Sequence, residues 1–377
     1  MENIRLNPDR LPERKEAHPM EITIKPAAPG NLKPKPRDES ALGFGKIFTD
    51  HMFVMNYTSE RGWHDPSIIP YGPFSLDPAT MCLHYGQEIF EGMKAYHGSD
   101  GSIYLFRPSD NIDRMNRSAE RLCMPTMDPE LFMEALKKLI LMEQDWIPHG
   151  RGTSLYIRPT MIATEVALGV HPSDSYLFYI ILCPVGAYYP EGFNPTKIYV
   201  SDTYTRTAPG GVGECKAAGN YAASLYASRE ASRLGYTQVL WLDALTRSRP
   251  EEVGTSNIFF VVNGRLVTPP LEGTILPGIT RDSVIKLARS WGIEVEERRL
   301  SMDEIIDMLS SGELTEIFAS GTAAVVSPVG LFNYRGREYE INGGSVGPLT
   351  ERLYNEILRI QYGEGEDIFG WRVRIGP

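Results

Sequence analysis

The chain has 377 residues, of which 42% are hydrophobic and 23% charged, and its formal net charge is -10. At about 150 residues per domain this length suggests two domains, with three as the alternative, and it allows a core that needs no disulfide or metal ion. The composition excludes an intrinsically disordered chain, a collagen and a small disulfide-stapled protein. The acidic balance and the lack of a basic run argue against nucleic acid as a partner.

The sequence also indicates the compartment. Its longest apolar run, residues 176–183, is shorter than the roughly 18–20 residues of a membrane-spanning helix and predicts a buried strand. The N-terminus shows no apolar segment of the kind found in a secretory signal. The four cysteines, Cys82, Cys123, Cys183 and Cys215, are far apart and lack zinc-site spacing. We expect a cytoplasmic protein with no membrane partner and no metal ion.

In chain order, residues 1–43 are rich in Pro, Lys and Glu and are interpreted as an N-terminal arm. A smaller α/β domain is expected over 44–185, an interdomain loop over 186–196, and a larger α+β domain over 197–377. Apolar spacing predicts helices at 111–122, 129–143 and 281–291, and strands at 102–106, 155–162, 176–182, 197–200, 238–242, 258–262 and 266–268.

The mixture of helices, strands and hairpins predicts an α+β fold rather than a uniform parallel sheet. Asn263-Gly264 is the strongest hairpin signal, because both residues tolerate the backbone of a two-residue turn.

Several familiar chemistries have no support in this sequence. There is no Walker A motif, no H-E-x-x-H, no G-x-S-x-G and no G-x-G-x-x-G. The seven histidines have no ligand spacing, and His84 is more simply a core or hydrogen-bonding residue. Metal-dependent hydrolysis, dinucleotide binding and a serine triad are therefore not expected.

Two residues suggest a different chemistry. Lys216 is followed by Ala217, Ala218 and Gly219, which let another group approach closely and suit an amine with a depressed pKa, as a Schiff-base lysine requires. Alone, it is more simply an ordinary surface lysine. Glu252 precedes a β-branched and aromatic strand, where its carboxylate could pair with a protonated heteroaromatic nitrogen. Alone, it is more simply a loop acid.

A phosphate site is the third candidate feature. Thr280 opens a predicted helix after Leu276-Pro277-Gly278-Ile279, and free backbone N–H groups at a helix start bind phosphate. Arg114 could add a charge-assisted contact to the same phosphate. The simpler alternatives are a plain N-cap and a solvated arginine. Together, the lysine, the acid and the phosphate cup match the needs of pyridoxal 5'-phosphate.

At these residues the chain resembles a known family. The matching stretches are FGKIFTDHM (44–52), LHYGQEIFEGMKAY (83–96), LFRPSDNIDRMNRSAERLCMP (105–125), SLYIRPTMIATEVALGV (154–170), ILCPVGAYYPEG (181–192), GGVGECKAAGNY (210–221), EVGTSNIF (252–259), TPPLEGTILPGITR (268–281) and FASGTAAVVSPV (318–329). The chain resembles the branched-chain amino-acid aminotransferases, which are class IV aminotransferases and fold type IV pyridoxal-phosphate enzymes. Within that family it resembles most the group that includes the animal enzymes.

This resemblance implies a two-domain α+β fold of the D-amino-acid aminotransferase type and a homodimer. It implies pyridoxal 5'-phosphate as the cofactor. The implied reaction is the reversible, ping-pong transfer of the amino group of L-leucine, L-isoleucine or L-valine to 2-oxoglutarate, giving the branched 2-oxo acid and L-glutamate. Its partners would be these small amino acids and 2-oxo acids.

The resemblance also assigns roles to residues. Lys216 would form the Schiff base and carry the proton, and Glu252 would keep the pyridine nitrogen protonated. Other cofactor contacts would come from Arg114, Tyr221, Thr255, Ile279, Thr280 and Thr322. The substrate pocket would be lined by Phe44, Tyr85, Phe90, Tyr156, Arg158, Val170, Tyr188, Thr255 and Ala323.

Within that pocket, Thr255 and Ala323 would receive the substrate carboxylate, and Tyr156 with Arg158 would accommodate the second carboxylate of glutamate. Two residues apart on a strand, Tyr156 and Arg158 point to one face. The alternative for Arg158 is a peripheral ion pair.

The sequence departs from the family at two places. Ala324 and Ser327 occupy the positions of a C-x-x-C pair in the animal enzymes, so a redox switch of that type cannot operate. Ala217, Ala218 and Ala222 stand where the family partly has glycine.

The nearest rivals are a D-amino-acid aminotransferase and an aminodeoxychorismate lyase, which share the lysine and the acid. The tyrosine-rich pocket and the Tyr156-x-Arg158 pair favour the branched-chain interpretation. A non-catalytic cofactor or amino-acid carrier, or a scaffold, would not need the full catalytic set.

Overall fold

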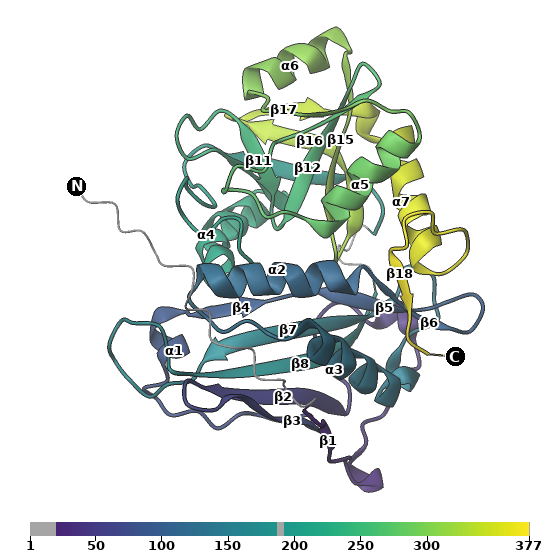
Figure 1. Cartoon of the computed structure of the whole chain (residues 1–377). Helices are drawn as coiled ribbons and strands as arrows, with labels where there is room; N and C mark the ends of the chain where they lie inside the picture. The colour runs from purple at the N-terminus through teal and green to yellow at the C-terminus, as the bar shows by residue number, and fades with distance from the viewer. Residues whose placement is uncertain (1–19, 187–191, 377) are drawn as a thin grey trace, which may run out of the picture.

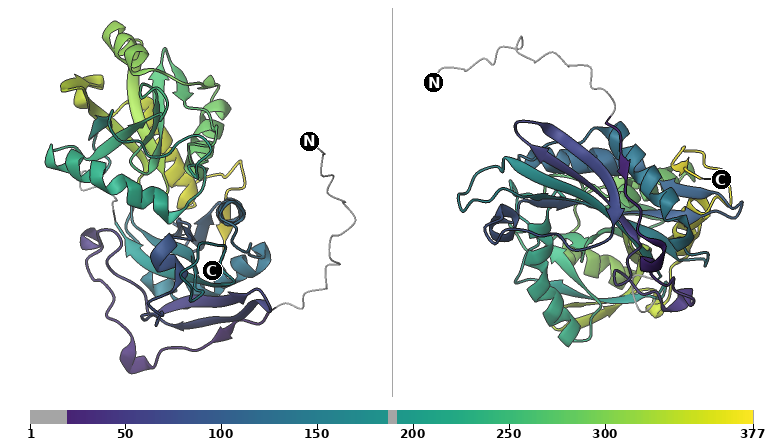
Figure 2. Two further views of the ribbon diagram at one scale, coloured as in Figure 1. Left: turned by 90° about the vertical axis from the view of Figure 1, so that its left-hand side faces the viewer. Right: turned by 90° about the horizontal axis from the view of Figure 1, so that it is seen from below.

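The computed structural model describes residues 20–186 and 192–376. Its strands form two nine-stranded sheets, the first built mainly from the N-terminal half and the second from the C-terminal half. Figure 1 shows them as two stacked domains, with helix α2 (Pro108–Arg121) lying along the boundary between them. The two further views in Figure 2 show the same division. An α+β architecture of two domains is therefore confirmed.

The first domain is a mostly antiparallel sheet with the strand order β1-β3-β2-β8-β7-β5-β6-β18, and β4 pairs with β7. Its strands are β1 (Thr23–Ile24), β2 (His51–Thr58), β3 (Gly62–Pro70), β4 (Glu88–Phe90), β5 (Met93–His97), β6 (Ile103–Phe106), β7 (Ser154–Ala163), β8 (Ser175–Val185) and β18 (Arg372–Arg374). Its α-helices are α1 (Met81–Tyr85), α2 and α3 (Pro129–Met142).

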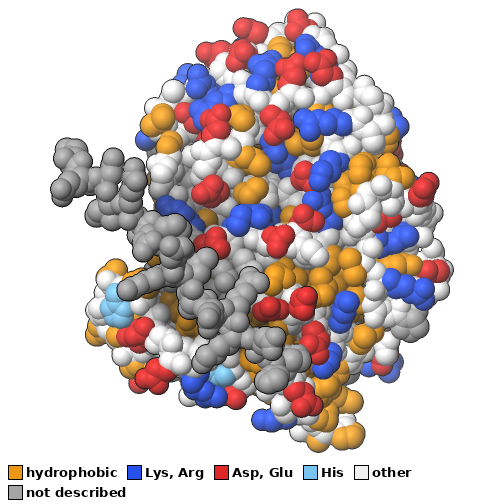
Figure 3. All heavy atoms as spheres, in the orientation of Figure 1, with side chains coloured by type: hydrophobic (Ala, Val, Ile, Leu, Met, Phe, Trp, Pro, Cys, Tyr) orange, Lys and Arg blue, Asp and Glu red, His pale blue; other side chains and the backbone are white. Residues whose placement is uncertain are grey.

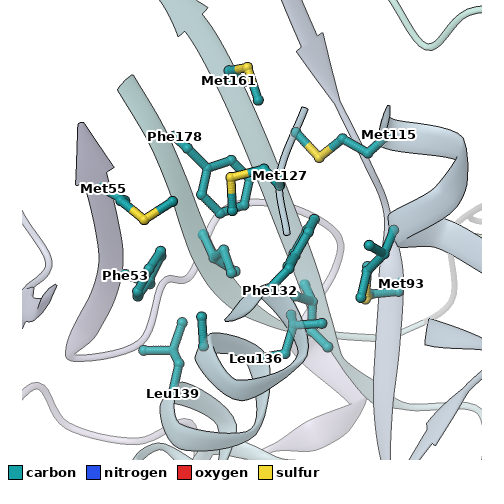
Figure 4. Packing of buried hydrophobic residues seen from close by; sticks show 14 of the residues in the cluster. Phe53, Met55, Met93, Met115, Met127, Phe132, Leu136, Leu139, Met161 and Phe178 are labelled. Carbon is teal, nitrogen blue, oxygen red and sulfur yellow. The ribbon is translucent and has the colours of Figure 1, made fainter. Parts of the chain in front are cut away.

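The period-two alternation of β7 decides which side chains reach the core and which reach the other domain. Leu155, Ile157 and Met161 are buried in the apolar cluster that also holds side chains of α2 and α3. In Figure 4, Phe132 of α3 and Phe178 of β8 pack together in this cluster, with ring centroids 5.0 Å apart. The alternate residues of β7 therefore face the second domain.

The second domain is a mixed sheet that closes on itself. Its order is β11-β10-β9-β16-β15-β12-β13-β14, and a further β11–β12 pairing closes six of these strands into a ring. The strands are β9 (Thr196–Ser201), β10 (Gln238–Leu242), β11 (Pro250–Val253), β12 (Ser256–Val262), β13 (Arg265–Thr268), β14 (Val295–Glu297), β15 (Leu314–Gly321), β16 (Val325–Tyr334) and β17 (Arg337–Glu340). The helices are α4 (Ala218–Arg233), α5 (Ile279–Ser290), α6 (Met302–Ser311) and α7 (Pro348–Gln361).

The helices with strong apolar spacing lie where that spacing predicts them. Helices α2, α3 and α5 match the predicted 111–122, 129–143 and 281–291 to within three residues at each end. The Asn263-Gly264 hairpin is also confirmed, because both residues have positive φ, 49° and 74°, between β12 and β13.

Helices α4, α6 and α7 were not predicted. Helix α4 is rich in Ala and Ser, and few of its side chains are buried, so it carries little apolar periodicity. Helix α6 does carry a local signal, a capping box between Ser301 and Glu304.

The predicted domain boundaries differ from the structure at both ends. Part of the predicted arm is attached to the first domain, because Thr23–Ile24 pairs with β3 and the Lys33 backbone N–H donates to Asp50. The C-terminal strand β18 crosses back and pairs with β6 of the first sheet. Residues 1–19 of the arm lie outside the described residues.

Three general properties bear on function. No helix in the described part of the chain is long and apolar enough to cross a membrane. The same residues contain no group of three or more His, Cys, Asp or Glu side chains that could hold a metal ion. On the face shown in Figure 3, acidic and basic side chains are interspersed.

Candidate active site

A cavity of about 490 Å³ lies between the two domains, and both contribute to its wall. From the first domain come residues of β4, β7, β8 and α2. From the second come the segment before α4, the β11–β12 turn, the start of α5 and the β15–β16 turn. The predicted site residues that line this cavity are Phe44, Phe90, Arg114, Tyr156, Arg158, Lys216, Tyr221, Glu252, Thr255, Ile279, Thr280, Thr322 and Ala323.

Lys216 projects into this cavity from the segment just before α4. Its backbone is tied to the first domain, since its N–H donates to Ser118 Oγ over 3.0 Å and its carbonyl accepts from the Phe90 N–H over 3.1 Å. Its Nζ donates to Tyr221 Oη over 2.7 Å. Burial, and then the nearby Arg114 guanidinium, lower the pKa of Lys216 to about 8. A part of this amine is therefore uncharged near neutral pH, unlike a surface lysine.

Tyr221 lies one turn into α4, beside the lysine. Burial raises the pKa of its hydroxyl to about 12, so the group keeps its proton. Its ring also packs edge-on against Phe90, with centroids 4.7 Å apart. The phenol is thus held in place as a hydrogen-bonding group for the amine.

Glu252 is buried in β11, with 2% of its surface exposed, so it is not a loop acid. Its Oε1 accepts from Asn257 Nδ2 over 3.2 Å. Its Oε2 lies 2.7 Å from Arg206 Nε, yet receives no hydrogen bond of suitable geometry. Burial raises the pKa of Glu252 to about 7, against the opposing effect of Arg206. The result is a buried carboxyl oxygen at the cavity wall that still lacks a donor.

Arg114 is buried rather than solvated, with 3% of its surface exposed. It forms a bidentate ion pair with the buried Glu91, over 2.7 Å from Nε and 2.9 Å from NH2. Burial alone would raise the pKa of Glu91, but Arg114 and the Asn111 amide hold that pKa below its usual value. The third guanidinium nitrogen donates to the Pro277 carbonyl over 3.1 Å. Arg114 thereby joins α2 of the first domain to the segment before α5 of the second.

The start of α5 forms another part of the wall. Its N-cap is Gly278, so Thr280 lies inside the first turn and is not the N-cap. A side chain at Gly278 would collide with the Asn257 amide, so the close approach requires glycine. Ile279 and Thr280 both line the cavity, where the N–H groups of a helix start favour an anion.

The cavity-facing side of β7 carries the polar pair expected from its spacing. Arg158 NH2 donates to Tyr156 Oη over 3.1 Å, and the guanidinium carbon lies 4.7 Å from the centre of the Phe90 ring. Arg158 Nε has no hydrogen-bond partner among the described residues. A Cβ at Gly92 would collide with the Tyr156 hydroxyl, which explains the glycine there. Arg158 therefore faces the cavity and is not a peripheral ion pair.

Three predicted substrate-pocket residues are not brought to this cavity by the described chain. Tyr85 is 40% exposed and donates to the Leu168 carbonyl over 2.6 Å. Val170 is 84% exposed. Neither lines the cavity of its own chain. Tyr188 lies outside the described residues.

Other functional neighbours were missed at the sequence level. Glu91 could have been noticed as an acid between Phe90 and Gly92 in an apolar stretch, where burial demands a cationic partner. Arg206 gave no signal, because only folding brings its loop beside Glu252. Glu88 and Thr160 also line the cavity beside Arg158.

Comparisons with known proteins agree with this geometry. The model of the family described as amino-transferase class IV matches residues 88–332. A branched-chain-amino-acid transaminase of Bacillus subtilis is 55% identical over 91% of this chain and 96% of its own length. The crystal structure of the Escherichia coli branched-chain amino acid aminotransferase is similar with a TM-score of 0.73 and 31% identity, over 87% of this chain and 99% of that one.

A further solved structure bears on the cofactor. The branched-chain amino acid aminotransferase of T.th., solved with pyridoxamine 5'-phosphate, is similar with a TM-score of 0.72 and 28% identity, over 85% of this chain and 98% of that one. The present site fits such a group, because the free Oε2 of Glu252, the Lys216 amine and the open start of α5 line one cavity.

The Arg114–Glu91 pair gives a testable prediction for stability. Glu91→Gln leaves the buried guanidinium without its counter-charge, which should lower the free energy of unfolding by about 3–5 kcal/mol. Guanidinium chloride unfolding of the cofactor-free protein measures this. Glu134→Gln is the matched control: its pair with Lys138 is solvent-exposed, so about 0–1 kcal/mol is expected. Equal losses in both variants would contradict the importance of the buried pair.

Proposed function

Because the chain belongs to the amino-transferase class IV family, we propose that it is a branched-chain amino-acid aminotransferase that uses pyridoxal 5'-phosphate. Its reaction transfers the amino group of L-leucine, L-isoleucine or L-valine to 2-oxoglutarate. One observation carries the proposal: a partly neutral amine, a buried carboxyl with a free oxygen and an open helix start line the same cavity.

Each of these groups has a role toward the cofactor. When bound, pyridoxal 5'-phosphate supplies an aldehyde and an electron-accepting ring that stabilises negative charge beside the substrate Cα. Lys216 would hold the aldehyde carbon and Glu252 the ring nitrogen. The Ile279 and Thr280 backbone, with Arg114 and Thr255, would hold the phosphate. Thr322 lies on the neighbouring turn of the wall.

Lys216 also acts as the base and acid of the reaction. A pKa of about 8 makes its Nζ a good proton acceptor near neutral pH, so it can take the proton from the substrate Cα and later return a proton. The Tyr221 hydroxyl, 2.7 Å away, fixes the position of Nζ.

The pocket wall suits both substrates of the proposed reaction. Phe44, Phe90 and Tyr156 supply aromatic surface for a branched aliphatic side chain. Arg158 supplies a cation with an unpartnered N–H for the second carboxylate of glutamate. Thr255 and Ala323 lie on turns of the opposite domain, where they would receive the α-carboxylate.

The visible spectrum of the purified holoenzyme tests the proposal. L-leucine without an oxo acid should abolish the cofactor's visible absorption band, and 2-oxoglutarate should restore it. Lys216→Ala should bind the cofactor without a covalent link and lose nearly all turnover, because the base is gone. A wild-type spectrum that ignores L-leucine but responds to D-leucine, or near-normal turnover by Lys216→Ala, would contradict the assignment.

Arg158 gives a prediction for substrate choice. Arg158→Ala should raise the KM for glutamate and 2-oxoglutarate by about 10- to 100-fold, the effect of losing one charge-assisted contact, and change the KM for leucine little. Steady-state kinetics with both amino acids measures this. Arg158→Lys keeps the charge without the fork and should fall between the two. Equal effects on leucine and glutamate would count against this role.

We also propose that the chain is a homodimer. Five exposed apolar side chains lie on α1 and on the 166–170 segment: Leu83, Tyr85, Val166, Leu168 and Val170. These two segments are joined by the Thr80–Val166 bridge and by the Tyr85–Leu168 hydrogen bond, so they form one patch. A second copy covering this patch would give Tyr85 and Val170 a pocket to line.

Light scattering after size exclusion tests the dimer. Leu168→Glu places a charge in the patch and should shift the protein to monomer at micromolar concentration. Leu245→Glu, at a 77% exposed position in the second domain, is the control and should leave the dimer intact. A wild-type monomer, or a Leu168→Glu dimer as stable as the wild type, would refute the proposal.

We further propose a cytoplasmic location. The four cysteines Cys82, Cys123, Cys183 and Cys215 are all free thiols, which suits a reducing compartment.

A further inference from the structure

Lys94 is a buried lysine with no role so far. It lies on β5, next to the site, and only 6% of its surface is exposed. Its Nζ donates to the Ala323 carbonyl over 2.8 Å. Among the described residues no carboxylate lies within 4.0 Å of Nζ, and burial is the single cause that lowers its pKa, to about 8. At neutral pH it is mostly a cation without a counter-charge.

The acceptor of this hydrogen bond lies on the turn that closes the cavity from the second domain. Ala323 follows β15 and precedes β16, and it lines the main cavity together with Gly321 and Thr322. Ala323 also lines a second cavity of about 340 Å³, on which Lys94 lies. Lys94 therefore reaches across the domain boundary and holds the turn from the side of this second cavity.

The hydrogen bond sets the orientation of one peptide of the turn. No cis peptide occurs in the described chain, so the Ala324 N–H points opposite to the Ala323 carbonyl. With the carbonyl held by Lys94, that N–H points away from the ammonium. One side chain of the first domain thus fixes a peptide dipole in a loop of the second.

A buried ammonium without a counter-ion is costly, so its presence here calls for a compensating anion. The main cavity admits a substrate whose α-carboxylate is expected at Thr255 and Ala323. We propose that Lys94 is a positioning residue for the substrate α-carboxylate, which holds the Thr322–Ala323 turn in its binding conformation and provides a positive charge behind it. This inference rests on the proposed aminotransferase function.

The first test separates substrate binding from the chemical step. Lys94→Met keeps the length and bulk of the side chain but removes the donor and the charge. It should raise the KM for both L-leucine and 2-oxoglutarate by about 10- to 100-fold, with kcat within about threefold, because both substrates carry the α-carboxylate. Arg158→Ala, in contrast, should affect only the dicarboxylic substrates.

The second test removes the carboxylate from the substrate. 3-Methylbutan-1-amine has the leucine side chain and amine but no carboxylate. The spectral half-reaction of the holoenzyme, followed at increasing concentrations, gives half-saturation for this amine and for L-leucine. Lys94→Met should weaken L-leucine and leave the amine within about twofold, as in a double-mutant cycle.

Two further variants sharpen this comparison. Lys94→Gln keeps an N–H donor without the charge, so partial recovery assigns the effect to the hydrogen bond, and no recovery assigns it to the charge. Tyr96→Phe is the matched control, because it removes a buried hydroxyl two residues along β5 at the same second cavity. It should match the wild type with both ligands.

The outcomes are distinguishable. Equal weakening of L-leucine and 3-methylbutan-1-amine in Lys94→Met would make Lys94 a general structural clamp and overturn the proposal. Unchanged half-saturation for L-leucine would overturn it as well. If Lys94→Met does not fold, the same comparison in Lys94→Gln decides. A wild-type holoenzyme that ignores L-leucine would instead overturn the proposed function.

Discussion

The buried ion pair between Glu91 and Arg114 is the interaction on which the site depends. It joins the β4–β5 connection and α2 of the first domain, and the remaining guanidinium nitrogen reaches the Pro277 carbonyl before α5 of the second. Because both charges are out of water, neither side chain can move without exposing the other to an unpaired state. The cavity walls from the two domains are thereby kept in register.

The electrostatics of the cavity follow from this arrangement. Arg114 satisfies Glu91 and at the same time lowers the pKa of Lys216, so one cation serves both the frame and the reacting amine. Glu252 has only partial compensation from Arg206 and retains a free oxygen. Charge is therefore balanced along the frame and left unbalanced at the groups that meet a cofactor or substrate. Lys94, behind the Ala323 turn, follows the same pattern.

Local sequence patterns predicted the elements that carry strong periodicity. The alternation of β7 placed Tyr156 and Arg158 on one face, and Asn263-Gly264 marked the β12–β13 hairpin, because both features depend only on neighbours in the chain. The roles of Lys216 and Glu252 came from resemblance together with local composition. Helix α4 and the return of β18 to the first sheet were not predictable in this way, since neither has a local pattern that identifies its partner.

The amino-acid sequence alone was enough to identify the family, the α+β class and the lysine and acid of the site, because these are encoded in contiguous motifs and their spacing. The pairing of Glu91 with Arg114, the placement of Arg206 beside Glu252 and the bond from Lys94 to Ala323 emerged only from the folded chain. Those pairs join residues 23, 46 and 229 positions apart. Electrostatic and hydrogen-bond partners at such separations are selected by packing of the two domains, and no local propensity specifies them.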